Sequence, residues 1–148
     1  MKSKGNVRMT LSRRDFVVGA SCGLAIATVS AVPAQASLVN ETISKFTGGA
    51  EIVPGGIILD TPEIAENGNT VPIDVSAPGA ASIMLLAAGN PVPAVATFNF
   101  GPLSGSRSGN TRIRLIKTQE VMAVAKMDDG SFRSAQATVK VTIGGCGG

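Results

Sequence analysis

The sequence predicts an all-β fold: an immunoglobulin-like antiparallel β-sandwich with a short N-terminal helix and a C-terminal glycine tail. About eight short runs of β-branched and aliphatic residues are separated by turn signals, the spacing typical of sandwiches. Several runs alternate apolar and polar side chains, as strands with one buried face do. The 112 residues that follow the first 36 are enough for one domain with a core of this kind.

Residues 1–36 have the features of a twin-arginine signal peptide. Arg13 and Arg14 precede Asp15-Phe16-Val17-Val18, and the apolar run continues to residue 32. This run is shorter than the ~20 residues that span a bilayer, which favours a cleaved signal over a membrane anchor. We expect the chain to be exported to the periplasm by the twin-arginine route and to be cleaved after Ala34-Gln35-Ala36.

The signal also accounts for the positive charge of the chain. The formal net charge is +3, but five basic residues and one acid lie before residue 37, so eight basic and nine acidic residues remain. The pI near 9.2 therefore gives no reason to expect nucleic acid or an anionic membrane as a partner.

Residues 37–143 are expected to form the sandwich. A short helix is expected over 40–46, ending at Gly48-Gly49. Strands are then expected at 51–53, 57–59, 64–66, 71–77, 82–88, 95–100, 111–116, 121–127 and 132–143. Turn residues separate them, notably Asn67-Gly68-Asn69, Gly89-Asn90-Pro91-Val92-Pro93 and Asp128-Asp129-Gly130-Ser131.

Missing residue types exclude several kinds of chemistry. The chain has no histidine, which rules out Ser-His and Cys-His nucleophile pairs and histidine metal sites. Cys22 lies in the signal and should leave with it, although a weak lipid-anchor reading of Gly19-Ala20-Ser21-Cys22 exists. One cysteine then remains, too few for a disulfide or a thiolate cluster, and we expect neither a metal nor a cofactor.

That cysteine, Cys146, is the predicted functional residue. It lies in the 144–148 tail between two glycine pairs, Gly144-Gly145 and Gly147-Gly148. Glycine loses more backbone freedom on ordering than any other residue, so we expect a mobile arm that carries the thiol roughly 10 Å beyond Ile143. No neighbouring Lys, Arg or His activates the thiol, which favours a covalent carrier of substrate over a catalytic nucleophile.

Two other functions remain open at this point. A secreted structural sandwich module could use its tail cysteine only to cross-link. A thiol enzyme such as a peroxidase is disfavoured, because the chain has no resolving cysteine and no activating base.

Asp128-Asp129 could form a cation site, although a turn is the better interpretation. Arg107, Arg112 and Arg114 could steer anions or a partner, but a solvated strand face is the default.

Several segments resemble the SoxY family, the substrate-carrying subunit of the SoxYZ complex of bacterial thiosulfate oxidation. They are the twin-arginine signal, Pro62 to Asn69, Val95 to Pro102, Thr111 to Leu115 and the terminal Gly-Gly-Cys-Gly-Gly. The resemblance implies an immunoglobulin-like sandwich that pairs with SoxZ, with Cys146 as the attachment point.

The resemblance also implies a cycle in which the carrier itself catalyses nothing. In the family, the cytochrome enzyme SoxXA oxidatively joins thiosulfate to the cysteine as an S-thiosulfonate. The manganese hydrolase SoxB then releases sulfate, and SoxCD, where present, oxidises the remaining sulfane sulfur. Folded export without visible cofactor ligands agrees with a partner subunit that assembles before export.

Overall fold

The computed structural model describes residues 34–142, and the signal up to residue 33 and the tail from residue 143 lie outside this range. A helix, α2 (Ala34–Thr47), is followed by nine strands. The strands are β1 (Ile52–Pro54), β2 (Ile58–Asp60), β3 (Ile64–Ala65), β4 (Val71–Ser76), β5 (Ala80–Ala87), β6 (Ala94–Asn99), β7 (Ser108–Ile113), β8 (Gln119–Met127) and β9 (Phe132–Val141).

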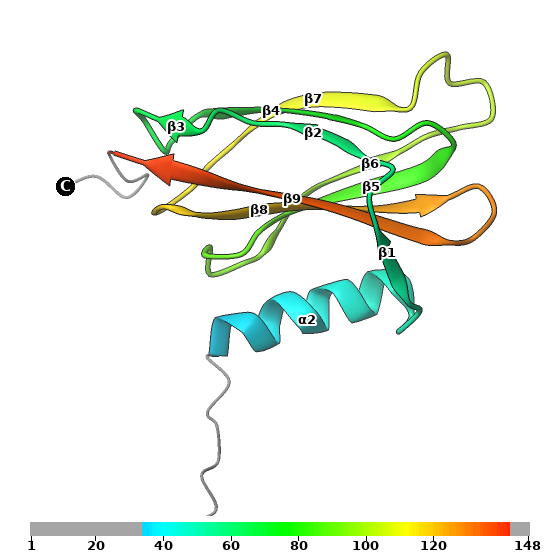
Figure 1. Cartoon of the computed structure of the whole chain (residues 1–148), viewed down its shortest axis with the longest axis horizontal. Helices are drawn as coiled ribbons and strands as arrows, with labels where there is room; N and C mark the ends of the chain where they lie inside the picture. The colour runs from blue at the N-terminus through cyan, green and yellow to red at the C-terminus, as the bar shows by residue number, and fades with distance from the viewer. Residues whose placement is uncertain (1–33, 143–148) are drawn as a thin grey trace, which may run out of the picture. The chain divides into compact units, whose positions relative to one another are not determined.

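The strands form two facing sheets, so the predicted β-sandwich is confirmed (Figure 1). The larger sheet has the order β1-β9-β8-β5-β6, with β3 also paired to β9, and the smaller sheet has the order β2-β4-β7. The strand pairing departs from the expected antiparallel arrangement at two short strands, because β1 and β3 run parallel to β9. These two strands are three and two residues long, too short to show a direction in the sequence.

The main core lies between the two sheets and follows the predicted alternation. On β4, Val71, Ile73 and Val75 are buried while the residues between them are exposed or half-buried. On β5, Ile83 and Leu85 point into the same core and are fully buried. Burial of side chains of this size stabilises the fold by about 1.5 to 3 kcal/mol each.

A second apolar cluster lies on the other face of the larger sheet, between the sheet and α2 (Figure 1). Met84 and Leu86 of β5 belong to it, together with Phe132 of β9, and Phe46 of α2 meets Phe132 edge to face at 6.0 Å between ring centroids. The helix therefore buries the second face of β5. This explains why the apolar run at 82–88 does not alternate.

The helix is longer than expected, since it begins at Ala34 and not at residue 40. Its apolar side chains Val39, Ile43 and Phe46 follow helical spacing and bring one side of α2 against the sheet. Its end agrees with the prediction: Gly48 and Gly49 adopt positive φ, and Gly49 N donates to Thr47 Oγ1 at 3.2 Å. The expected cleavage site thus lies in the first turn of this helix.

One strand boundary is also corrected. The strand expected at 111–116 is β7 at Ser108–Ile113, because its partner β4 pairs with it only as far as Val71↔Ile113. The alternation of burial nevertheless continues beyond the strand, with Leu115 fully buried and Arg114 exposed.

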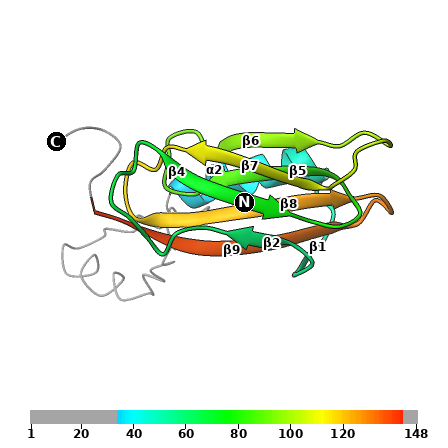
Figure 2. The same cartoon turned by 90° about the horizontal axis from the view of Figure 1, so that it is seen from above.

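The two lateral sides of the sandwich differ (Figure 2). On one side the chain passes from β1 to β2 to β3, alternating between the sheets, and β1 and β3 cover the two ends of the β9 edge. On the other side β6 and β7 are the outermost strands of their sheets. They are in contact, since a Cβ at Gly109 of β7 would lie 2.6 Å from the Phe98 ring of β6.

Candidate functional site

The candidate site is the end of β9, from which the tail with Cys146 continues. Cys146 and its four flanking glycines lie outside the described residues, so the structure describes the root of the predicted arm and not the arm. The root is Val141–Thr142, the last two residues of the described range. Its position is set by bonds to a segment on each side.

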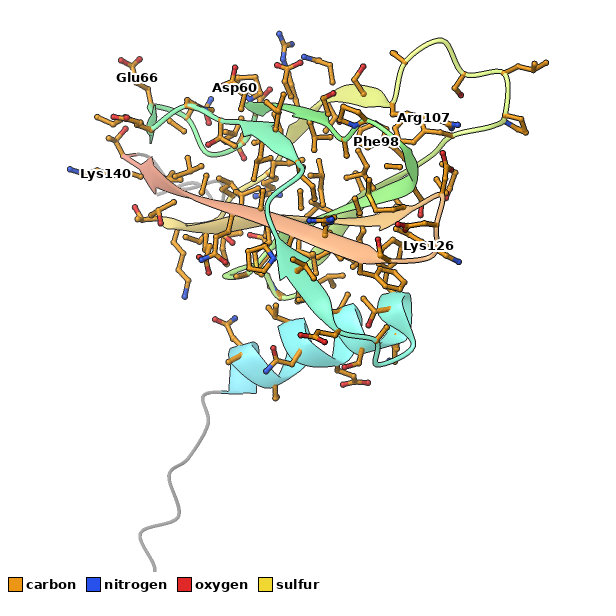
Figure 3. All side chains as sticks on the ribbon, turned by 45° about the vertical axis from the view of Figure 1, so that its right-hand side comes forward. Asp60, Glu66, Phe98, Arg107, Lys126 and Lys140 are labelled. Carbon is orange, nitrogen blue, oxygen red and sulfur yellow. The ribbon has the colours of Figure 1, made fainter. Side chains whose placement is uncertain are left out.

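On the outer side, the root is bonded to β3 and the residues beside it. Lys140 N donates to Glu63 O at 2.9 Å and Thr142 N donates to Ala65 O at 3.0 Å, continuing the parallel ladder. The Thr142 hydroxyl donates to Glu66 O at 3.1 Å. Glu66 and Lys140 are seen together at this end of the molecule (Figure 3). The segment from Pro62 to Asn69, which the sequence predicted as a short strand and a turn, therefore supports the root.

On the inner side, the root is bonded to the loop that leads into β8. Val141 N donates to Thr118 Oγ1 at 3.0 Å, and the same hydroxyl lies 3.4 Å from Val141 O. One step further along, Gln119 pairs with Val139, which is fully buried. The root is thus held between two neighbours up to Thr142.

Behind this loop lies a buried polar cluster that the sequence analysis missed. Gly89 N donates to Gln119 Oε1 at 2.6 Å, and Gln119 Nε2 donates to Asn90 Oδ1 at 2.9 Å. Asn90 Nδ2 in turn donates to Arg114 O at 2.7 Å. The cluster ties the β5–β6 turn to the loop that holds the root, and among the described residues no buried side-chain polar atom lacks a partner.

Only one sequence signal pointed toward this cluster. Gln119 is a polar residue at the start of a strand whose next residues on the same face, Val121 and Ala123, are fully buried. A buried amide needs partners. Lys117 O, at 3.2 Å, is two positions away, but Gly89 and Asn90 lie about thirty positions away along the chain. Nothing in the local pattern identifies them.

A turn completes the support of the root. Asn69 N donates to Asn67 Oδ1 at 2.9 Å, the bond of an Asx turn, as the Asn-Gly-Asn sequence predicted. Gly68 O accepts from Leu115 N at 2.7 Å, which attaches this turn to the chain beyond β7.

The three arginines do not form one group. Arg107 Nη1 donates to Gly101 O at 2.9 Å, its guanidinium lies 5.8 Å from the centroid of the Phe100 ring, and Nη2 lies 3.8 Å from Asp128. It lies at the opposite end of the sandwich from Glu66 and Lys140 (Figure 3). Its side chain is only 19% exposed, so Arg107 is a structural residue of the loop before β7.

Arg112 and Arg114 are exposed, as the alternation predicted. Arg114 follows β7, on the stretch whose carbonyl accepts from Asn90, and it lines a shallow hollow with Pro91 and Ile116 near the loop that holds the root. Arg112 lies on β7 opposite Pro72. The two are therefore nearer to the root than Arg107 is.

The Asp128-Asp129 pair forms a turn. Asp129 Oδ1 accepts from Ser131 N at 2.8 Å and from Ser131 Oγ at 2.6 Å, and Gly130 has a positive φ of 84°. The two bonds from Ser131 lower the pKa of the Asp129 carboxyl below its ordinary value. Asp129 Oδ1 is thus engaged in the hairpin turn.

Within residues 34–142, no three His, Cys, Asp or Glu side chains are grouped so that they could hold a metal ion. In the same part of the chain no helix has both the length and the apolar character needed to cross a bilayer.

In a comparison with protein families, the chain matches the family described as "Sulfur oxidation protein SoxY" over residues 43–146. The matched range begins in α2 and ends at the tail cysteine. No curated protein matches the chain significantly.

Among solved structures, the sulfur carrier protein SoxY from Chlorobium limicola f thiosulfatophilum is 34% identical. The match covers 73% of this chain and 99% of that one, with a TM-score of 0.65. A superoxide reductase (neelaredoxin) from Ignicoccus hospitalis has a TM-score of 0.52 at 16% identity, covering 59% of this chain and 80% of its own. At that identity the likeness shows a shared fold alone.

Proposed function

The chain belongs to the SoxY family, and from this premise we propose that it is a periplasmic sulfur carrier of thiosulfate oxidation that binds its substrate covalently through Cys146. The observation that carries the proposal is the extent of the family match, which ends at Cys146 itself. The matched solved relative is named a sulfur carrier protein.

The geometry of the root supports an arm that works outside the sandwich. The described chain is bonded on both sides as far as Thr142, and Cys146 is the fourth residue after Thr142. Four residues span at most about 14 Å when extended. With hydrogen in place of side chains on either side of the cysteine, such a tail is narrow enough to enter a channel in another protein.

The loading step needs an oxidant, which the carrier does not supply. The Cys146 thiol and thiosulfate combine through a new S–S bond to give a cysteine S-thiosulfonate, with release of one proton and two electrons. The electrons pass to a SoxXA-type cytochrome. Hydrolysis by a SoxB-type enzyme then adds water across the terminal S–S bond, releases sulfate and protons, and leaves a persulfide on Cys146.

A SoxCD-type enzyme, where present, would oxidise the remaining sulfane sulfur. The carrier presents the sulfur in each of these reactions and is not itself an enzyme.

The proposal includes a SoxZ-like partner that lacks its own signal and is exported with this chain. Cleavage after Ala36 would remove the first three residues of α2 but leave Val39, Ile43 and Phe46, the side chains that pack toward the sheet. The helix would therefore keep its apolar contacts with the sheet after cleavage. This is consistent with export as a folded heterodimer.

The test is the mass of the C-terminal peptide from cells grown on thiosulfate. We expect adducts corresponding to added sulfane sulfur or thiosulfate on Cys146, and none on Cys146→Ser. The Cys146→Ser chain should unfold at the same temperature as the wild type, because residues 144–148 lie beyond the bonded root. A disulfide-linked dimer as the only modified form would instead support a cross-linking module and would contradict the carrier.

A further inference from the structure

The outer edge of β6 is a sheet edge with no strand beyond it in the described part of the chain. β5 and β6 pair with Ser82↔Asn99 and Met84↔Thr97, and Phe100 N donates to Ala81 O at 2.9 Å. In an antiparallel ladder, alternate residues direct their backbone groups to the same neighbour. The backbone N–H and C=O groups of Phe98 and Phe100 therefore point toward β5. Those of Thr97 and Asn99 point outward, away from β5.

The other sheet edges are protected in ways that proteins commonly use. The outer edge of β9 is paired with β1 at one end and β3 at the other. β2 is three residues long and ends in Asp60, and β7 carries the exposed Arg112. Short strands, charged side chains and covering segments all discourage pairing with another chain.

By contrast, β6 has neither a charged residue nor a proline. Its sequence is Ala-Val-Ala-Thr-Phe-Asn, and its pairing irregularity falls at Val95, near its start. Residues 96–99 therefore present a regular edge. An unprotected edge of this kind is a template for a strand from another chain.

An ordered turn at the end of β6 presents a fully exposed apolar side chain. Ser104 N donates to Gly101 O at 3.1 Å and Gly101 N donates to Ser104 Oγ at 3.2 Å, which closes a turn over Pro102 and Leu103. Arg107 fixes the base of this turn through its bond to Gly101 O. Leu103 is 99% exposed, and Val92, just before the other end of β6, is 70% exposed.

We propose that the outer edge of β6, together with the turn that presents Leu103, is the docking surface for the partner subunit. The partner adds an extended strand to the larger sheet, and Leu103 inserts into an apolar pocket on it. Another peptide backbone is the chemical complement of the outward N–H and C=O groups of Thr97 and Asn99. This inference rests on the proposed function for the existence of the partner, and it assigns the partner a place.

The test uses the full chain co-expressed with the SoxZ-like subunit of the same organism. Thr97→Pro removes an outward N–H and should weaken the complex about tenfold or more. The free chain should still fold, because edge strands tolerate a proline whose nitrogen faces outward. Its matched control is Thr97→Val, which keeps the N–H and should bind as the wild type does. Leu103→Asp should weaken binding about 30-fold, whereas Ile58→Asp, on β2 at the opposite side, should not change it.

Hydrogen exchange of the wild-type protein provides a readout that does not depend on any variant folding. The amides of Thr97 and Asn99 should exchange rapidly in the free chain and slowly in the complex. A complex that leaves these amides unprotected, or that Thr97→Pro and Leu103→Asp do not weaken, would overturn the assignment. Protection that appears with the chain alone as its concentration rises would also overturn it, because a second copy would then occupy the edge.

The two proposals can fail separately. Sulfur adducts on Cys146 without protection of β6 would leave the carrier function standing and remove this docking surface. A β6-dependent complex without any adducts would do the reverse.

Discussion

The two ends of β9 are held in place by different kinds of bonds. At its start, the hairpin from Met127 to Ser131 uses charged side chains: the Asp129 carboxylate accepts two bonds from Ser131, and Asp128 lies beside Arg107. At its other end, Val141 and Thr142 are held by backbone groups and by the hydroxyls of Thr118 and Thr142. The described bonds of Val141 and Thr142 thus all join uncharged groups.

Under the proposed function, in which the tail carries anionic sulfur species, this difference would matter. Bonds between neutral groups change little when a charged cargo is added or removed nearby, whereas ion pairs are screened by salt and respond to neighbouring charge. A root built from neutral bonds would keep its position through the proposed loading cycle. The hairpin end lies about 30 Å away along β9, beyond the reach of the tail.

The largest expected effect concerns the tail beyond the neutral end. Replacing Gly145 and Gly147 with Val adds β-branched bulk beside the thiol, so enzyme-driven loading of thiosulfate should fall on the order of a hundredfold. Alkylation by a small thiol reagent should stay within a few-fold of the wild type. Gly105→Val is the matched control, because it lies in the loop before β7 with nothing within 4 Å of an added Cβ, and it should load normally.

Loading that survives both valines would show that the glycines do not serve entry into a pocket. The tail would then be a chain end that happens to contain a cysteine.

The second prediction removes the cluster behind the root. Gln119→Leu leaves Gly89 N without its acceptor and Asn90 Oδ1 without one of its donors, so the free energy of unfolding should fall by about 3 kcal/mol. Gln136→Leu, an exposed position on β9, is the control and should change it by less than about 0.5 kcal/mol. Urea unfolding measures both. Equal stability of the two variants would mean that the cluster contributes nothing to the neutral end.

The third prediction compares the ends directly. Thr142→Val keeps the shape of the side chain and removes its bond to Glu66 O, so it should cost about 1 kcal/mol. The cost should be the same at low and high salt, because no charge is involved. Unfolding measured at two ionic strengths is the check. A cost that shrinks in salt would mean that charged groups contribute to holding the root after all.

How far the sequence predicts these features depends on how local each one is. The hairpin at Asp128-Asp129-Gly130-Ser131, the strands β4 and β8, and the alternation of Arg112 and Arg114 with Ile113 and Leu115 follow from neighbouring residues, and they were predicted. The role given to the tail cysteine also rests on local sequence, its flanking glycines, and it stays a prediction because Cys146 lies outside the described residues. The contacts at the neutral end were not predicted, since Thr118 meets Val141 and Glu66 meets Thr142 across 23 and 76 positions of the chain.

The predicted start of the helix, at residue 40, was wrong for a different reason. Ala34-Gln35-Ala36 fits both a cleavage site and a helix, because alanine and glutamine are good helix formers. The parallel pairing of β1 and β3 could not be predicted either, because runs of two or three residues carry no periodicity.

The smallest expected effect is at the charged end. Because the amide and hydroxyl of Ser131 hold the pKa of Asp129 below its ordinary value of 3.8, the carboxylate stabilises the hairpin above that pH. This stabilisation should be lost as the pH falls through the lowered pKa, without change at the neutral end. An NMR titration should place the midpoint of Asp129 below 3.8, and Ser131→Ala should raise it. A wild-type midpoint at 3.8 or above would contradict the role of Ser131.

The position of β9 also has a mechanical consequence. An enzyme that drew the tail into a channel along the axis of β9 would pull along the strand, while the hydrogen bonds to β8 run across that axis. Such a pull loads many of these bonds at once in shear and does not peel them away one by one. β1 and β3, paired with the two ends of the same strand, share the load. The sandwich is therefore expected to resist a pulling force applied at the end of β9 without unfolding.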